Sequence, residues 1–169
     1  MIKNIISKAK SIKDRQRRKN APNVLSAINT IILELNRSGQ TPTPARVSQL
    51  VVLCDLWCLK LLDRPLHSSE TTMVKFGGPT VMAVHNALRH YGFEPITDFV
   101  KHPAAPSIDY PHLEDRDLYK IVAKTVDSYR KLTSYQLGQM LGRIVPKTPP
   151  LQVISEESMR EAFNKVATA

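Results

Sequence analysis

Apolar residues return at helical spacing through most of the chain. Between residues 23 and 37 they form one stripe, and Gly39 stands where this helix is expected to end, because glycine adopts positive φ without penalty. A second helix is expected to begin with Thr43 as its N-cap and Pro44 in its first position. Residues 47–62 of that helix are apolar almost all round, which predicts a helix that other elements cover on most sides.

The rest of the pattern predicts four more helices and at most one small β element. The helices are expected at residues 79–91 after Gly77-Gly78, at residues 114–132, after a capping box at Thr133, and after Ser155. Weak alternation predicts short strands at residues 71–76 and 96–100, which we expect to pair. The predicted fold class is mainly α: a single compact domain over residues 21–169, with about six helices around the central buried helix.

Residues 1–20 differ from the rest of the chain in charge. Eight basic residues against one aspartate give this segment a net charge of +7, out of +9 for the whole chain. The basic residues are Lys3, Lys8, Lys10, Lys13, Arg15, Arg17, Arg18 and Lys19. Isoleucines recur between the first lysines at helical spacing, which predicts a short amphipathic helix. Residues 15–20 are purely polar, and Ala21-Pro22 marks the expected boundary between this basic tail and the domain.

Length and composition favour a globular, intracellular protein. A chain of 169 residues with 42% apolar residues suits one domain with a real core. Two cysteines can form at most one disulfide, which is too few to hold a chain of this size together. The first ten residues lack the apolar run of a secretory signal. We therefore expect a cytoplasmic location. No transmembrane helix is expected, since residues 47–62 fall short of the ~20 apolar residues that a span requires.

Few residues suggest chemistry. Cys54 and Cys58 share one helix face, but a zinc site needs two further ligands, so we interpret both as buried apolar residues and expect no metal. Asp55 lies in the most apolar helix, where a carboxylate could act as a general base. A structural role is favoured, either a hydrogen bond to a neighbouring helix or an ion pair with a base such as Arg89, because buried charges are usually paired.

No catalytic or cofactor motif stands out elsewhere. The five histidines follow no metal or catalytic spacing, and we interpret them as surface or loop residues; they are His67, His85, His90, His102 and His112. Gly77-Gly78-Pro79 is interpreted as a turn that opens a helix, because both phosphate-binding glycine patterns are missing. An active site would rest on Asp55 and the histidines alone. We therefore expect a protein that is not an enzyme and needs no cofactor.

Three segments together resemble the Panacea domain, the SocA-like antitoxin family. They read LVVLCDLWCLKLLDRPL at residues 50–66, SSETTMVKFGGPTVMAVHNALRHYG at 68–92 and LTSYQLGQMLGR at 132–143. The resemblance covers residues 24–150, with an extra glycine in the Gly-Pro turn and Thr80 where valine is usual. It implies a Panacea-like helical domain and an antitoxin, which neutralises a toxin encoded beside it, in bacteria, phages or prophages. It implies no catalytic residues.

Two classes of function therefore remain open from the sequence. The first is an antitoxin-like protein that binds a toxin or another protein partner, and a phage counter-defence protein or a protease adaptor is a variant of it. Its expected contacts are the amphipathic tail, the helix at residues 79–91 and the turn of Phe76, Gly77, Gly78, Pro79 and Thr80. The second is a regulator that binds nucleic acid through the basic tail. The tail lacks aromatic residues for base stacking, and its isoleucines fit an anionic membrane or a partner groove better.

Overall fold

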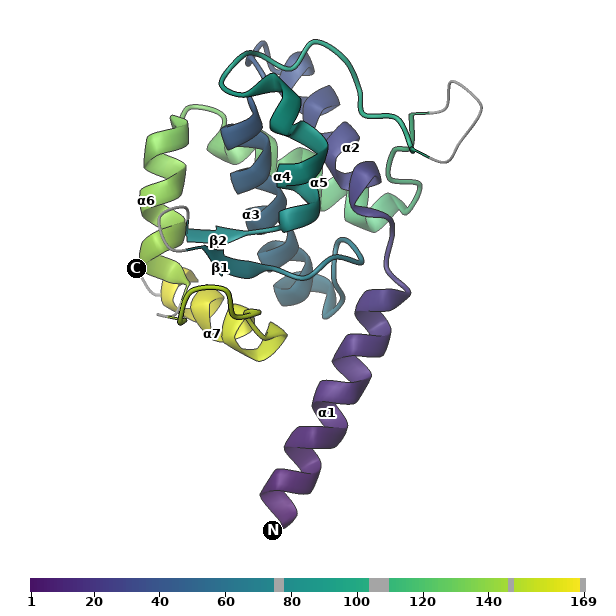
Figure 1. Ribbon diagram of the computed structural model, residues 1–169, viewed down its shortest axis with the longest axis vertical. Coiled ribbons are helices and arrows are strands. Elements are labelled where there is room, and N and C mark those ends of the chain that lie inside the picture. The colour runs from purple at the N-terminus through teal and green to yellow at the C-terminus, as the bar shows by residue number, and fades with distance from the viewer. Residues whose placement is uncertain (75–77, 104–109, 146–147, 168–169) are drawn as a thin grey trace.

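The computed structural model describes residues 1–74, 78–103, 110–145 and 148–167, and these are mainly helical (Figure 1). The helices are α1 (Ile2–Lys19), α2 (Val24–Arg37), α3 (Pro44–Leu62), α4 (Met82–Leu88), the short 3-10 helix η1 (Arg89–Tyr91), α5 (Arg116–Tyr129), α6 (Ser134–Ile144) and α7 (Glu156–Ala167). One two-stranded antiparallel sheet accompanies them. The mainly α fold class is confirmed. Among the described helices, none is both long and apolar enough to cross a membrane.

Helix α3 is the centre of the fold, as the sequence predicted. It contacts α2, α4, α5, α6, α7 and strand β2 (Gly78–Thr80). The helix begins as expected, because the Thr43 hydroxyl accepts a hydrogen bond from the Arg46 N–H at 3.3 Å and Pro44 follows it. Ten of its residues are buried, including Cys54, Asp55 and Cys58. Cover from six elements accounts for a helix that is apolar almost all round.

The small sheet pairs different segments from those that the alternation suggested. Strand β1 (Thr72–Val74) pairs with β2, with Thr72 opposite Thr80, and Val153 bridges Thr72 on the other side. The predicted pairing of residues 71–76 with residues 96–100 is wrong. The N–H of Val100 instead donates to Oδ1 of Asn29 on α2 at 2.7 Å, and the Asn29 amide donates back to its carbonyl at 2.8 Å. One buried side chain thus takes the place of a partner strand at Val100.

The helix expected from residue 79 begins later. Gly78 and Pro79 belong to β2 and α4 starts at Met82, so their interpretation as a turn that opens a helix is wrong. The cause is the pairing with β1. Pro79 lies opposite Met73, whose N–H and carbonyl bond to residues 152 and 151 on the far side. The ladder therefore needs no N–H from Pro79, and a proline is tolerated there. Phe76 and Gly77 lie outside the described residues.

The remaining helix starts follow local signals. Thr133 and Gln136 form the expected capping box of α6, and the Ser155 hydroxyl accepts from the Ser158 N–H at 3.1 Å at the start of α7. Helix α5 begins two residues later than expected, with Asp115 as its N-cap. The N-terminal helix is longer than predicted, since residues 15–19 remain helical up to Lys19. Their side chains explain this, because Arg17 and Arg18 are held by ion pairs to the domain.

Candidate partner-binding surfaces on α1 and α4

Helix α1 projects from the body of the chain, with the N-terminus at its far end (Figure 1). Every residue from 1 to 13 is exposed. The exposure of the isoleucines is the most informative, because apolar side chains are the ones expected to be covered. Ile2 is 74% exposed, Ile5 63%, Ile6 62% and Ile12 65%. The helix therefore carries an apolar stripe that nothing in the described part of the chain buries.

The stripe lies on the side of α1 opposite to the side that meets the domain. At about 100° of rotation per residue, the four isoleucines and Ala9 occupy an arc of about 120°. Ser7, Ser11, Asp14 and Arg18 occupy the opposite side of the same projection, at positions i, i+4, i+7 and i+11. These four line a groove between α1 and the segment that leads into α7. The apolar stripe therefore points away from the protein's own body.

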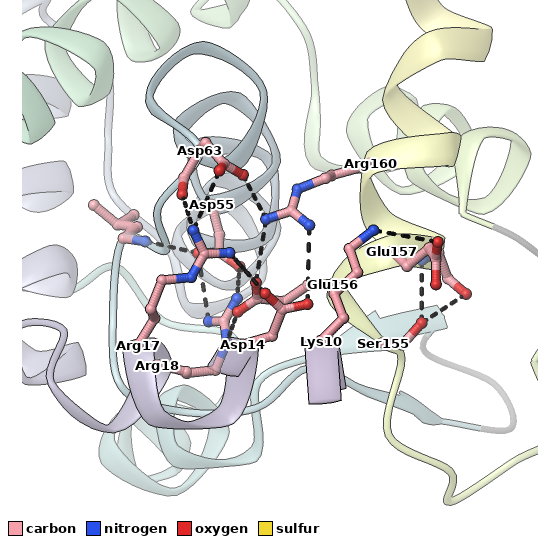
Figure 2. Close-up of polar contacts among 12 residues, drawn as sticks. Lys10, Asp14, Arg17, Arg18, Asp55, Asp63, Ser155, Glu156, Glu157 and Arg160 are labelled. Carbon is pink, nitrogen blue, oxygen red and sulfur yellow. Dashed lines mark hydrogen bonds and ion pairs between the residues drawn. The ribbon is translucent and has the colours of Figure 1, made fainter. Parts of the chain in front are cut away.

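Arg18 fastens the C-terminal end of α1 to the domain (Figure 2). Its guanidinium forms an ion pair with Asp55 of α3 at 3.0 Å and another with Glu156 of α7 at 3.1 Å. It also donates to the carbonyls of His67 and Ser69, each at 3.1 Å. Asp55 has no exposed surface, and its Oδ1 accepts the Leu66 N–H at 2.8 Å. The partners of Arg18 come from three separate parts of the chain, so one side chain joins α1, α3 and α7.

A second set of ion pairs surrounds this contact. Arg17 bonds to Asp14 at 2.7 Å and to Asp63 at 3.3 Å, and Arg160 of α7 bonds to Asp63 at 2.7 Å (Figure 2). With Arg18, Asp55 and Glu156 these residues make up what we call the charge cluster: Asp14, Arg17, Arg18, Asp55, Asp63, Glu156 and Arg160. Four carboxylates against three guanidinium groups leave the cluster near neutrality. The orientation of α1 is therefore set by a nearly balanced network.

Burial shifts the proton affinities of the cluster and its surroundings. Burial lowers the pKa of Arg18, but Asp55 and Glu156 outweigh this effect and raise it above its usual value, so Arg18 stays charged. Burial raises the pKa of the Glu156 carboxyl. It lowers the pKa of His67 to about 4, so this fully buried imidazole is neutral at pH 7. A neutral His67 adds no second positive charge beside Arg18.

Several expected residues have other roles in the structure. Asp55 pairs with Arg18 and not with Arg89, which is exposed on η1. Arg17 and Arg18 are therefore not free parts of the basic tail, whereas six basic residues are exposed: Lys3, Lys8, Lys10, Lys13, Arg15 and Lys19. Lys10 lies 3.5 Å from Glu157. A buried carboxylate in an apolar helix does signal a cation nearby, but it does not identify which arginine supplies it.

The surface formed by α4 and η1 is a second candidate. Val84 and Leu88 anchor this segment in the core, whereas Met82 is 43% exposed and Phe93 is fully exposed. The outward side chains between them follow helical spacing: His85, Asn86, Arg89 and His90. Of the predicted contact residues next to this surface, Pro79 is buried and Gly78 and Thr80 are half-buried. The exposed side of α4 therefore offers more contact area than the Gly-Pro segment itself.

Phe93 is held outside the core by a tight turn. Gly92 ends η1 with φ 59° and ψ −113°, a conformation that residues with a Cβ rarely adopt. The Glu94 N–H then donates to the Tyr91 carbonyl at 2.9 Å and closes the turn. An aromatic residue at the tip of a closed turn presents a large apolar surface with little conformational freedom to lose.

The residues considered for metal binding or catalysis have structural explanations. Cys54 and Cys58 are buried, and burial raises the pKa of both thiols well above the usual value. No group of three or more metal-ligating side chains occurs among the described residues. His67 lies in the loop that follows α3, as expected, but it is buried there, and its Nδ1 accepts the Ser69 N–H at 3.2 Å. His85 and His90 are exposed as expected.

Fold and surfaces together define a mainly helical protein with a central buried helix and a projecting, basic amphipathic helix. Comparisons with models of protein families, with curated proteins and with solved structures found no match for this chain.

Proposed function

We propose that this chain is an antitoxin-like binding protein, which neutralises a partner protein by direct contact through the exposed surface of α4 and η1. The observation that carries the proposal is the full exposure of Phe93 at the tip of a closed turn. Aromatic residues of this kind supply much of the energy of protein interfaces. The resemblance of residues 68–92 to the Panacea family leads to the same class of function.

The chemistry of this surface suits a protein partner. Met82 and Phe93 provide apolar contact at its two ends, and the polar side chains of Asn86, Arg89 and His90 lie between them. Interfaces between separately folded proteins combine apolar contacts with polar ones in this way. Val84 and Leu88 are buried without exposed surface, so the helix that carries the contact residues is fixed to the core. Binding would then require little rearrangement of the backbone.

The experiment is co-purification of the tagged chain with the product of the gene beside its own, with a parallel growth assay in cells that express both. A complex and rescue of growth are expected for the natural sequence. Phe93→Ala should weaken the complex at least tenfold, as truncation of an aromatic anchor residue does at other interfaces. Tyr135→Ala is the matched control, because Tyr135 is an aromatic residue that is 73% exposed on α6.

Two outcomes would contradict the proposal. The first is the absence of both a complex and growth rescue with the natural sequence. The second is equal loss of binding in Phe93→Ala and Tyr135→Ala, which would mean that the surface of α4 and η1 is not the contact. Circular dichroism of each variant controls for folding, and no change is expected because both side chains are exposed.

A further inference from the structure

The apolar stripe of α1 is the largest feature that the fold leaves unexplained. Eleven large apolar residues are exposed in the described part of the chain, and five of them lie in the first twelve residues. They are Met1, Ile2, Ile5, Ile6 and Ile12. Such a concentration on one helix marks a binding surface, whereas single exposed apolar residues are ordinary.

The charge around the stripe has one sign. Residues 1–13 contain four lysines and no acidic residue. In helical projection Lys3 and Lys10 lie along one border of the stripe and Lys8 along the other, while Lys13 lies inside its edge. Lysines in these positions can keep their ammonium groups in water while their carbon chains extend over apolar surroundings. An apolar stripe bordered by lysines is complementary to a surface that is apolar inside and negatively charged outside.

We propose that residues 2–13 of α1 bind the surface of an anionic membrane, with the helix parallel to the lipid plane. The isoleucines enter the boundary between headgroups and acyl chains, and Lys3, Lys8 and Lys13 contact the lipid phosphates. Nucleic acid fits this surface less well, because it offers nothing to cover four isoleucines and the helix has no aromatic residue to stack on bases.

The attachment of α1 to the domain fits this arrangement. Ser7, Ser11, Asp14 and Arg18 face the body of the chain, so the body lies on the side of the helix away from the stripe. Contact with a flat surface is therefore not obstructed by the protein itself. The ion pairs of Arg18 fix the last turn of α1, and a helix with one fixed turn needs no separate nucleation step for residues 2–13.

The test is sedimentation of the full chain with vesicles. One set contains phosphatidylcholine with phosphatidylserine, and the other contains phosphatidylcholine alone. We expect binding to the anionic vesicles and a strong decrease on addition of salt. The double variant Ile5→Ser/Ile6→Ser should bind at least tenfold more weakly, because its apolar contact is reduced. Lys3→Gln and Lys8→Gln should each weaken binding about fivefold.

The matched control is Asn4→Ala/Ser7→Ala, which changes two residues of the same helix outside the stripe and should bind like the natural sequence. All these positions are exposed, so each variant should unfold at the same denaturant concentration as the natural protein. Phe93→Ala should also bind vesicles normally. Failure of membrane binding is therefore distinguishable from failure of the protein contact proposed above.

Four outcomes would overturn the proposal. One is that the natural chain does not sediment with anionic vesicles, and a second is that Ile5→Ser/Ile6→Ser sediments as well as the natural chain. A third is tight, salt-sensitive binding of duplex DNA or single-stranded RNA that survives the isoleucine changes, where the added nucleic acid also prevents binding to vesicles. The fourth is a dimer in solution that the isoleucine changes dissociate, since the stripe would then be the contact between two copies.

Discussion

Helices α1 and α3 are nearly equal in length, with 18 and 19 residues, yet they occupy opposite environments. Helix α3 buries most of its apolar residues under six other elements, whereas α1 leaves four isoleucines more than 60% exposed. The polar residues show the reverse. Asp55 of α3 is fully buried and depends on a cation from elsewhere, and Arg18 of α1 supplies it. The structure of α3 is thus completed by one residue of the helix that is otherwise outside the core.

The largest effect is expected from removing that cation. Arg18→Met would leave Asp55 buried without its ion pair, so the free energy of unfolding should fall by about 3–5 kcal/mol. Chemical denaturation measures this change. Arg15→Met is the control, since Arg15 is exposed on the same helix and its change should stay within about 0.5 kcal/mol. Addition of Asp55→Asn to Arg18→Met should restore part of the lost stability. Equal stability of Arg18→Met and Arg15→Met would contradict the proposed role of the Arg18–Asp55 ion pair.

The second-largest effect is expected from truncating a buried apolar residue of α3, compared with an exposed one of α1. Leu53→Ala should lower the free energy of unfolding by about 2–5 kcal/mol, because Leu53 of α3 is 2% exposed and its truncation leaves a cavity. Ile6→Ala should change it by less than about 0.5 kcal/mol. The midpoints of urea denaturation measure both. A large loss of stability in Ile6→Ala would show that the stripe of α1 is covered by protein in solution.

The third effect is a dependence on pH. His67 has a pKa of about 4 in the folded chain against 6.5 for an ordinary imidazole, so the unfolded chain takes up a proton first as the pH falls. Its contribution to stability should be constant above pH 7, fall between about pH 6.5 and pH 4 and total about 3 kcal/mol. The free energy of unfolding should fall less between pH 7 and pH 4.5 in His67→Asn than in the natural sequence. In this variant the amide oxygen replaces Nδ1 as the acceptor for the Ser69 N–H.

Glu156 also contributes to the pH dependence of stability, so the natural sequence must be compared with His67→Asn. Burial raises the pKa of its carboxyl, so the folded chain binds that proton more readily than the unfolded chain. Its contribution to stability is therefore greater in acid and is lost as the pH rises through the raised value, which opposes the contribution of His67. The difference between the natural sequence and His67→Asn removes this second effect. An identical pH dependence in the two proteins would show that His67 is not the group responsible.

The smallest effect is expected from an exposed ion pair between α1 and α7. Lys10 and Glu157 lie 3.5 Å apart with more than half of each side chain exposed, whereas Arg18 and Glu156 are buried. Lys10→Gln should change the free energy of unfolding by less than about 0.5 kcal/mol, because water and side-chain entropy cancel most of the attraction. Thermal unfolding at low and high salt checks this. A loss comparable to that of Arg18→Met would mean that α1 is attached along its length.

Local signals in the sequence were sufficient for most of the helices. The cap of α3 at Thr43-Pro44, the capping box of α6 and the Ser155 cap of α7 all lie within three residues of the helix that they start. The pairing of the strands could not be predicted from such local signals. The second neighbour of β1 is Val153, about 80 residues away, and Asn29 satisfies the backbone of Val100 from a distant helix. Pairing at such separations depends on the packing of the whole chain.

The candidate surfaces were predictable to different extents. Spacing alone identified the amphipathic character of α1, because a helix places every third or fourth residue on one side whatever surrounds it. The role of Arg18 was not visible, since it differs from its seven basic neighbours only in what it meets in space. Phe93 was also missed. A single aromatic residue after a helix gives no sign of whether it turns inward or outward.

The sequence by itself determined that the chain forms helices, which face of each is apolar, where most of them begin, and that positive charge collects in the first twenty residues. The tertiary structure decided which apolar faces are covered, that Arg18 neutralises Asp55, and that the isoleucines of α1 point away from the body. The physical reason is that the side on which a residue lies follows from the repeat of its own helix, whereas burial and ion pairing require a second surface that only the folded chain brings near.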